Sequence, residues 1–132
     1  KSMAFGVRMG IERYNLDIAA RVEEGRTTAN ERMAAVFDQT DFIICASNPD
    51  IAFPAHIESN TRVAGEKAPA GNNGALTIPA NISGNPAISI PAGLVDGMPV
   101  GVQIIGVQHS DRAILDLAYL WEQHNPWPLT SL

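Results

Sequence analysis

Proline distribution divides this chain of 132 residues into two parts that cannot fold alike. Residues 1–48 contain no proline and three glycines, whereas all nine prolines and eight of the eleven glycines come later. Proline interrupts a helix because it lacks a backbone N–H and its ring restricts φ. The first part is therefore predicted to be helical. The second is predicted to consist of loops and strands, closed by one helix.

Two helices are predicted in the proline-free part, followed by a strand. Residues 2–24 read as broadly helical, and Gly25 is expected to end that helix. A second helix is expected to begin just after Thr28, because Thr28 and Glu31 have the spacing of a capping box. The apolar run Phe42–Ala46 follows and is typical of a strand buried on both faces.

A long irregular segment and a β-hairpin are predicted next. Four prolines rule out a continuous helix across residues 47–80, and a loop this long usually covers something or belongs to a larger structure. Residues 87–90 and 100–105 are β-rich runs on either side of Asp96-Gly97, the strongest short signal for a hairpin. Pro91 and Pro99 cannot donate to a ladder, so they are expected at strand ends or bulges.

A terminal amphipathic helix completes the pattern. Its apolar positions, at i, i+3, i+4 and i+7, are Ile114, Leu117, Ala118 and Trp121. Ser110 or Asp111 can cap its start, and Asn125-Pro126 should end it. The expected organisation is one α/β domain over residues 1–132. It has helices over 1–40, strands and the long loop over 41–106, and a terminal helix and tail over 107–132.

Composition narrows the class of protein. The net charge is −5 and no basic residues cluster, which argues against nucleic acid or an anionic membrane as a partner. No apolar run approaches the length of a membrane span, and the first residues lack the features of a signal peptide. Cys45 is the only cysteine and is expected to be a buried, reduced thiol in a cytoplasmic protein. Lys1 falls within a predicted helix, which suggests a fragment or a processed piece.

No complete active site is visible in the residues themselves. The three histidines, His56, His109 and His124, have no metal-ligand spacing, so neither a metal nor a cofactor is predicted. Ser83 is expected in a turn and Ser89 in a strand, and neither lies in a nucleophile motif. The two lysines, Lys1 and Lys67, are at a terminus and in an exposed-looking loop. We therefore predict no catalytic, cofactor-binding or metal-binding residue in this chain.

One stretch nevertheless resembles a known family. Residues 81–106, NISGNPAISIPAGLVDGMPVGVQIIG, resemble the C-terminal hallmark of the amidase signature family. That hallmark is an Asn, then Gly-x-Pro-Ala-hydrophobic-Ser-hydrophobic-Pro-x-Gly, then Gly-hydrophobic-Pro-Val-Gly-hydrophobic-Gln. Residues 37–49, FDQTDFIICASNP, and residues 125–128, NPWP, also look like family segments.

The resemblance implies an α/β/α sandwich around a mixed β-sheet and hydrolysis of amide C–N bonds by a Ser–cis-Ser–Lys triad. That triad lies in the N-terminal half of family members, and its Gly- and Ser-rich signature is absent from these residues. The chain would supply sheet scaffold and a candidate pocket wall for a small-molecule amide, with the N-terminal portion of the same amidase as its partner. Alone it would be inactive. The alternative is a non-catalytic, degenerate module that self-associates or binds a protein partner.

Overall fold

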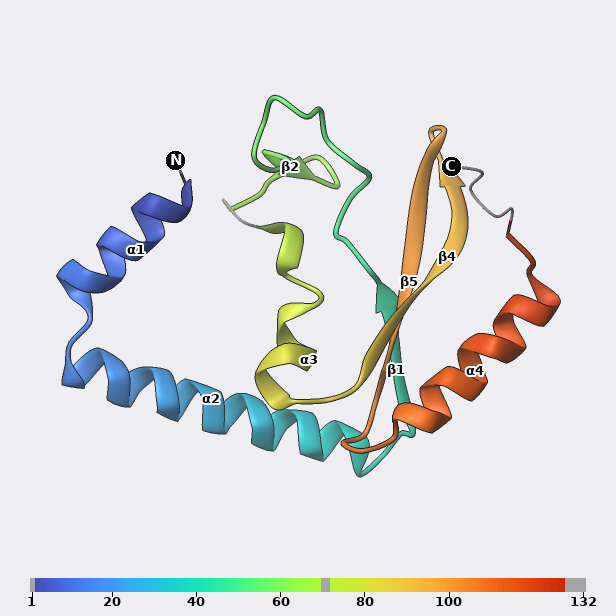
Figure 1. Cartoon of the computed structure of the whole chain (residues 1–132), viewed down its shortest axis with the longest axis horizontal. Coiled ribbons are helices and arrows are strands. Elements are labelled where there is room, and N and C mark those ends of the chain that lie inside the picture. Colours follow the sequence, from blue (N-terminus) through green and yellow to red (C-terminus); the bar gives the residue numbers. More distant parts are fainter. Residues whose placement is uncertain (1, 70–71, 128–132) are drawn as a thin grey trace.

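The computed structural model describes residues 2–69 and 72–127 as helices around a small β-sheet (Figure 1). The α-helices are α1 (Ser2–Arg13), α2 (Leu16–Phe37), α3 (Ile78–Ser83) and α4 (Asp111–His124). The strands are β1 (Phe42–Ala46), β2 (Arg62–Val63), β3 (Glu66–Lys67), β4 (Ala87–Val95) and β5 (Met98–Gly106), and a 3-10 turn, η1, covers Asn72–Gly74. Helices and strands in one chain confirm the predicted α/β class.

The helical part is divided at a different place from the one predicted. The break lies between Arg13 and Leu16, and Asn15 caps α2 by accepting a hydrogen bond of 3.0 Å from the Ile18 amide. Gly25 and Thr28 lie inside α2, so both predicted boundaries were wrong. A glycine costs only about 1 kcal/mol in a helix interior, which a long helix tolerates.

The hairpin prediction is confirmed and extended. β4 and β5 pair antiparallel around Asp96 and Gly97, whose φ angles of 51° and 76° both lie in the left-handed region. This is the conformation that a two-residue turn of type I′ requires. The register shifts between Pro91 and Leu94, so Pro91 stands at a bulge as predicted. Pro99 lies next to the start of β5, which agrees with its predicted place at a strand end.

The main sheet has the order β1-β5-β4, with β5 antiparallel to both neighbours. α4 packs on β4 and β5 (Figure 1), and the core between them contains Ile90, Ile104, Ile114 and Ala118. The amphipathic terminal helix is therefore confirmed. By contrast, β1 is not buried on both faces, because it is an edge strand. Ile44, in the middle of β1, is 64% exposed.

The segment 47–80 is more ordered than an irregular loop. It contains the β2–β3 hairpin, η1 and the start of α3. Ser83 is the last residue of α3 rather than part of a turn, and Gly84 caps that helix. α3 packs against α2, as Figure 1 also shows. Among the described residues, no helix has both the length and the apolar character that crossing a bilayer requires.

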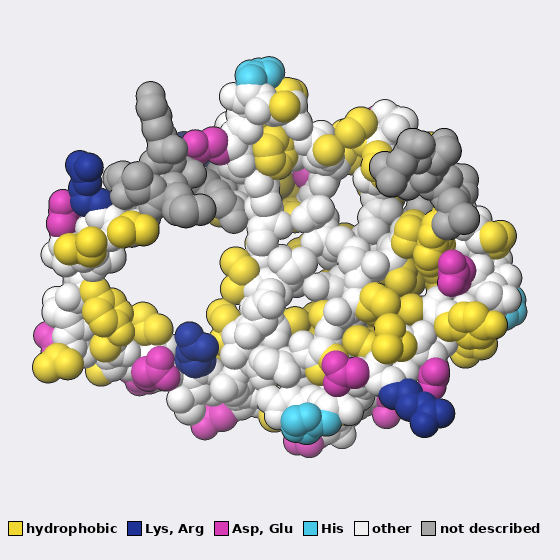
Figure 2. All heavy atoms as spheres, viewed as in Figure 1, with side chains coloured by type: hydrophobic (Ala, Val, Ile, Leu, Met, Phe, Trp, Pro, Cys, Tyr) yellow, Lys and Arg dark blue, Asp and Glu magenta, His cyan; other side chains and the backbone are white. Residues whose placement is uncertain are grey.

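Apolar side chains remain exposed along the two N-terminal helices. Figure 2 shows them bordering an opening between these helices and the rest of the molecule. The most exposed are Ile11 at 79% and Leu16 at 88%, and Val7, Tyr14 and Val22 are also exposed. Burying such side chains is favourable, so these helices carry a surface suited to contact with another part of a protein.

Candidate functional site

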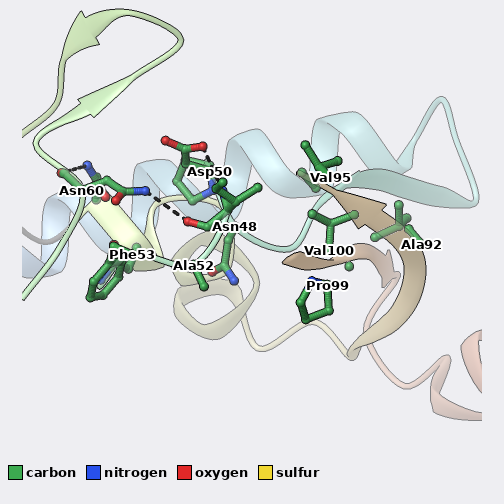
Figure 3. Close-up of a pocket in the computed structure, with 16 residues that line it drawn as sticks. Asn48, Asp50, Ala52, Phe53, Asn60, Ala92, Val95, Pro99 and Val100 are labelled. Atoms are coloured by element: carbon green, nitrogen blue, oxygen red, sulfur yellow. Dashed lines mark hydrogen bonds between the residues drawn. The ribbon is translucent and has the colours of Figure 1, made fainter. Parts of the chain in front are cut away.

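A pocket of about 700 Å³ opens between the segment after β1 and the β4–β5 hairpin (Figure 3). The loop side of Figure 3 carries Asn48, Asp50, Ala52, Phe53 and Asn60, and the hairpin side carries Ala92, Val95, Pro99 and Val100. Two segments that are far apart in the sequence thus face each other across one hollow. The predicted pocket wall in residues 47–80 corresponds to its loop side.

A pair of serine hydroxyls fixes the point where the loop leaves the sheet. The Ser47 amide donates to the Gly101 carbonyl at 2.9 Å, which extends the β1–β5 ladder by one residue. The Ser47 and Ser89 Oγ atoms lie 2.5 Å apart, so a hydrogen bond crosses from the end of β1 to β4. Both hydroxyls lie over Gly101, where an added Cβ would be 2.8 Å and 2.9 Å from the two oxygens.

Buried Gln103 holds the other end of the loop. Its side-chain nitrogen donates to the Leu76 carbonyl at 2.9 Å and lies 3.3 Å from the Cys45 sulfur. Gln103 is 4% exposed, and a buried amide of this kind needs such partners. Cys45 itself is half-buried, so the prediction of a buried thiol overstated how far β1 is covered.

Asparagine side chains order the loop between these two anchors. The side-chain nitrogen of Asn60 donates to the Ile51 carbonyl at 3.1 Å. That of Asn72 donates to the Asn60 carbonyl at 3.0 Å, and Asn72 is 8% exposed. Sequence reasoning missed these residues. The usable signal was a long loop rich in asparagine, because Asn side chains readily bond to backbone groups.

The structure does not assemble the weighed serines and histidines into a catalytic group. The Ser83 hydroxyl donates to the Pro79 carbonyl at 2.8 Å, and Ser89 bonds to Ser47. His56 is exposed, and His124 Nδ1 lies 2.8 Å from the Leu120 carbonyl.

The remaining candidates are no closer to such a group. His109 and Lys67 are exposed, and Lys1 lies outside the described residues. Within residues 2–69 and 72–127, no three His, Cys, Asp or Glu side chains are placed to hold a metal ion.

Solved structures with this fold come from larger amide-cleaving enzymes. A bacterial aryl acylamidase described as an amidase signature enzyme is 27% identical with a TM-score of 0.79, covering 89% of this chain and 25% of that one. A 6-aminohexanoate cyclic dimer hydrolase is 28% identical with a TM-score of 0.72, covering 92% and 27%. The fold expected from the resemblance is therefore confirmed.

A sequence model of the amidase family matches residues 8–115, so the chain belongs to the amidase signature family. Among curated relatives, a glutamyl-tRNA(Gln) amidotransferase subunit from Latilactobacillus sakei is 39% identical over 98 residues, covering 74% of this chain and 19% of the relative. The chain spans about a fifth of the length of the curated relatives it matches.

Proposed function

We propose that this chain is the C-terminal part of an amidase that hydrolyses a carboxylic amide C–N bond. In this proposal the Ser–cis-Ser–Lys triad lies outside the chain, and residues 1–132 act as one domain that supplies sheet scaffold and one wall of the substrate pocket. No residue of the chain takes a catalytic role. A cytoplasmic location is part of the proposal and rests on the single cysteine, which permits no internal disulfide.

The observation that carries the proposal is the pocket between the post-β1 loop and the β4–β5 hairpin. The anchors at Ser47 and Gln103 hold this pocket in shape, and such preformed concave sites are where small molecules bind. The family match supplies amide chemistry, while the described serines bond to structural partners. A wall without a nucleophile is what the C-terminal part of such an enzyme would contribute.

The alternative, a non-catalytic module that self-associates, draws on the exposed apolar residues of α1 and α2. The same surface would be covered by the N-terminal portion of the amidase in the main proposal. Exposure alone therefore favours neither function. The two differ in what the 132-residue chain does in isolation.

The test begins with the coding sequence upstream of Lys1. We expect a lysine followed by a Gly- and Ser-rich motif there, and we expect the full-length protein to hydrolyse simple aryl amides. The chain alone should be inactive and should depend on the remaining polypeptide to stay in solution. A stable, inactive dimer of the isolated chain would favour the module. Amide hydrolysis by the isolated chain, lost in Ser89→Ala or His56→Ala, would overturn both.

A further inference from the structure

We infer that the pocket beside β1 accepts an uncharged, apolar acyl group and discriminates against one that carries a carboxylate. This inference rests on the proposed function and adds a substrate class to it. It is drawn from three features of the pocket: its apolar walls, the charge at its rim, and the direction in which its amide side chains donate.

Apolar side chains form most of both walls. Ile51, Ala52 and Phe53 come from the loop, and Val95, Pro99 and Val100 face them from the hairpin (Figure 3). Ile51 and Phe53 are half-buried within the chain itself, so their positions are set by packing. An alkyl or aryl group in this hollow would lose its contact with water on two sides, which is favourable for an apolar group and costly for a charged one.

The only ionisable side chain among the sixteen described lining residues is Asp50. Its carboxylate accepts a hydrogen bond of 2.8 Å from the Ile51 amide, which holds the negative charge on the loop side of the pocket. No Lys, Arg or His is among those lining residues. Arg62, the arginine of the same loop, donates instead to the Gly65 carbonyl within the β2–β3 hairpin. A bound carboxylate would therefore meet a like charge and no cation from this wall.

The neutral polar groups of the pocket reinforce this preference. The side-chain nitrogens of Asn60 and Asn72 point to backbone carbonyls, where they hold the loop together. These nitrogens are therefore already engaged, although a carboxylate needs several N–H or O–H donors when it leaves water. The wall offers a carboxylate neither charge nor a set of free donors.

The experiment compares three primary amides of similar length: hexanamide, the monoamide of adipic acid, and 6-aminohexanamide. Their leaving group is ammonia, so only the acyl chain can occupy the pocket. With the full-length protein, we expect kcat/KM for the adipic monoamide to be roughly tenfold or more below that for hexanamide, and 6-aminohexanamide to fall between them.

Two variants test whether this wall causes the difference. Asp50→Asn retains an oxygen for the Ile51 amide and should raise the ratio of adipic monoamide to hexanamide kcat/KM by about threefold to tenfold. Ala92→Lys, on the exposed hairpin side, should raise the same ratio by adding a cation. The matched control, Asp41→Asn, removes an exposed carboxylate at the other end of β1 and should leave the ratio unchanged.

The outcomes separate the two proposals. Hydrolysis of hexanamide with a ratio that rises in the Asp50 and Ala92 variants supports the inference. Equal or better use of the adipic monoamide by the unmodified protein, or a ratio that neither variant moves, overturns the inference and leaves the proposed function standing. If the full-length protein hydrolyses no amide at all, the proposed function fails and the inference fails with it.

Discussion

Gly101 lies where β1, β5 and β4 come closest together, and replacing it with alanine should destabilise the sheet beside the pocket. The added Cβ would lie 2.8 Å from Ser47 Oγ, 2.9 Å from Ser89 Oγ and 3.3 Å from Ser47 Cβ. The two hydroxyls must move, although they are hydrogen-bonded to each other at 2.5 Å. Overpacking of this kind costs about 1–3 kcal/mol, and loss of the hydrogen bond adds about 1 kcal/mol. We therefore expect Gly101→Ala to lower the free energy of unfolding by about 2–4 kcal/mol.

Urea unfolding of the full-length protein, followed by circular dichroism, measures this effect, and a double-mutant design isolates its cause. Removing both hydroxyls, with Ser47→Ala and Ser89→Ala, leaves only the contact at 3.3 Å. In that background Gly101→Ala should cost less than about 1 kcal/mol, because side chains in contact couple by about 0.5–3 kcal/mol. The matched control is Gly25→Ala inside α2, where an added Cβ meets nothing within 4 Å. It should stabilise the protein by about 0.5–1 kcal/mol.

Two results would refute the reasoning about Gly101. The first is a Gly101→Ala protein whose unfolding free energy is within about 0.5 kcal/mol of the unmodified protein, the range of an ordinary surface change. The second is an undiminished cost of Gly101→Ala when both hydroxyls are absent. Either result would mean that the serine pair is not what excludes a side chain at this position.

Three further predictions concern the same sheet and use the same unfolding measurement. Ile114→Ala should cost about 2–5 kcal/mol because Ile114 packs in the core beneath α4, whereas Leu115→Ala, at a 59% exposed position, should change stability by less than about 1 kcal/mol. Equal effects would contradict the assigned face of α4. Gly97→Ala should cost about 1–2 kcal/mol, since φ is +76° there, and an unchanged midpoint would argue against the left-handed turn. Gln103→Leu should cost about 1–3 kcal/mol because the Leu76 carbonyl loses its side-chain donor, and a neutral effect would show that water replaces that donor.

The candidate site shows how far sequence reasoning could go. The long loop of residues 47–80 was predicted to be pocket wall, because a structureless segment of that length needs a reason to exist, and part of it does line the hollow. The opposite wall, the bulged end of the β4–β5 hairpin, was not predicted. Ser47 and Ser89 are 42 residues apart, and nothing in local spacing pairs two serines at that distance.

The sequence by itself determined the features that depend on neighbouring residues. The Asp96-Gly97 turn, the strand at residues 42–46 and the amphipathic helix after Ser110 were all predicted, because backbone preference and side-chain periodicity are local properties. The family could also be read from residues 81–106, and the comparison with the family model confirmed it.

Only the tertiary structure decided where competing local signals resolve and which surfaces are covered. Thr28 and Asn15 both offered a helix cap, and the chain uses Asn15 while α2 continues through Gly25. β1 has the composition of a strand buried on both faces, yet α4 packs on β4 and β5 and Ile44 stays exposed. Burial depends on which elements meet in space. Composition records only which side chains would benefit from burial.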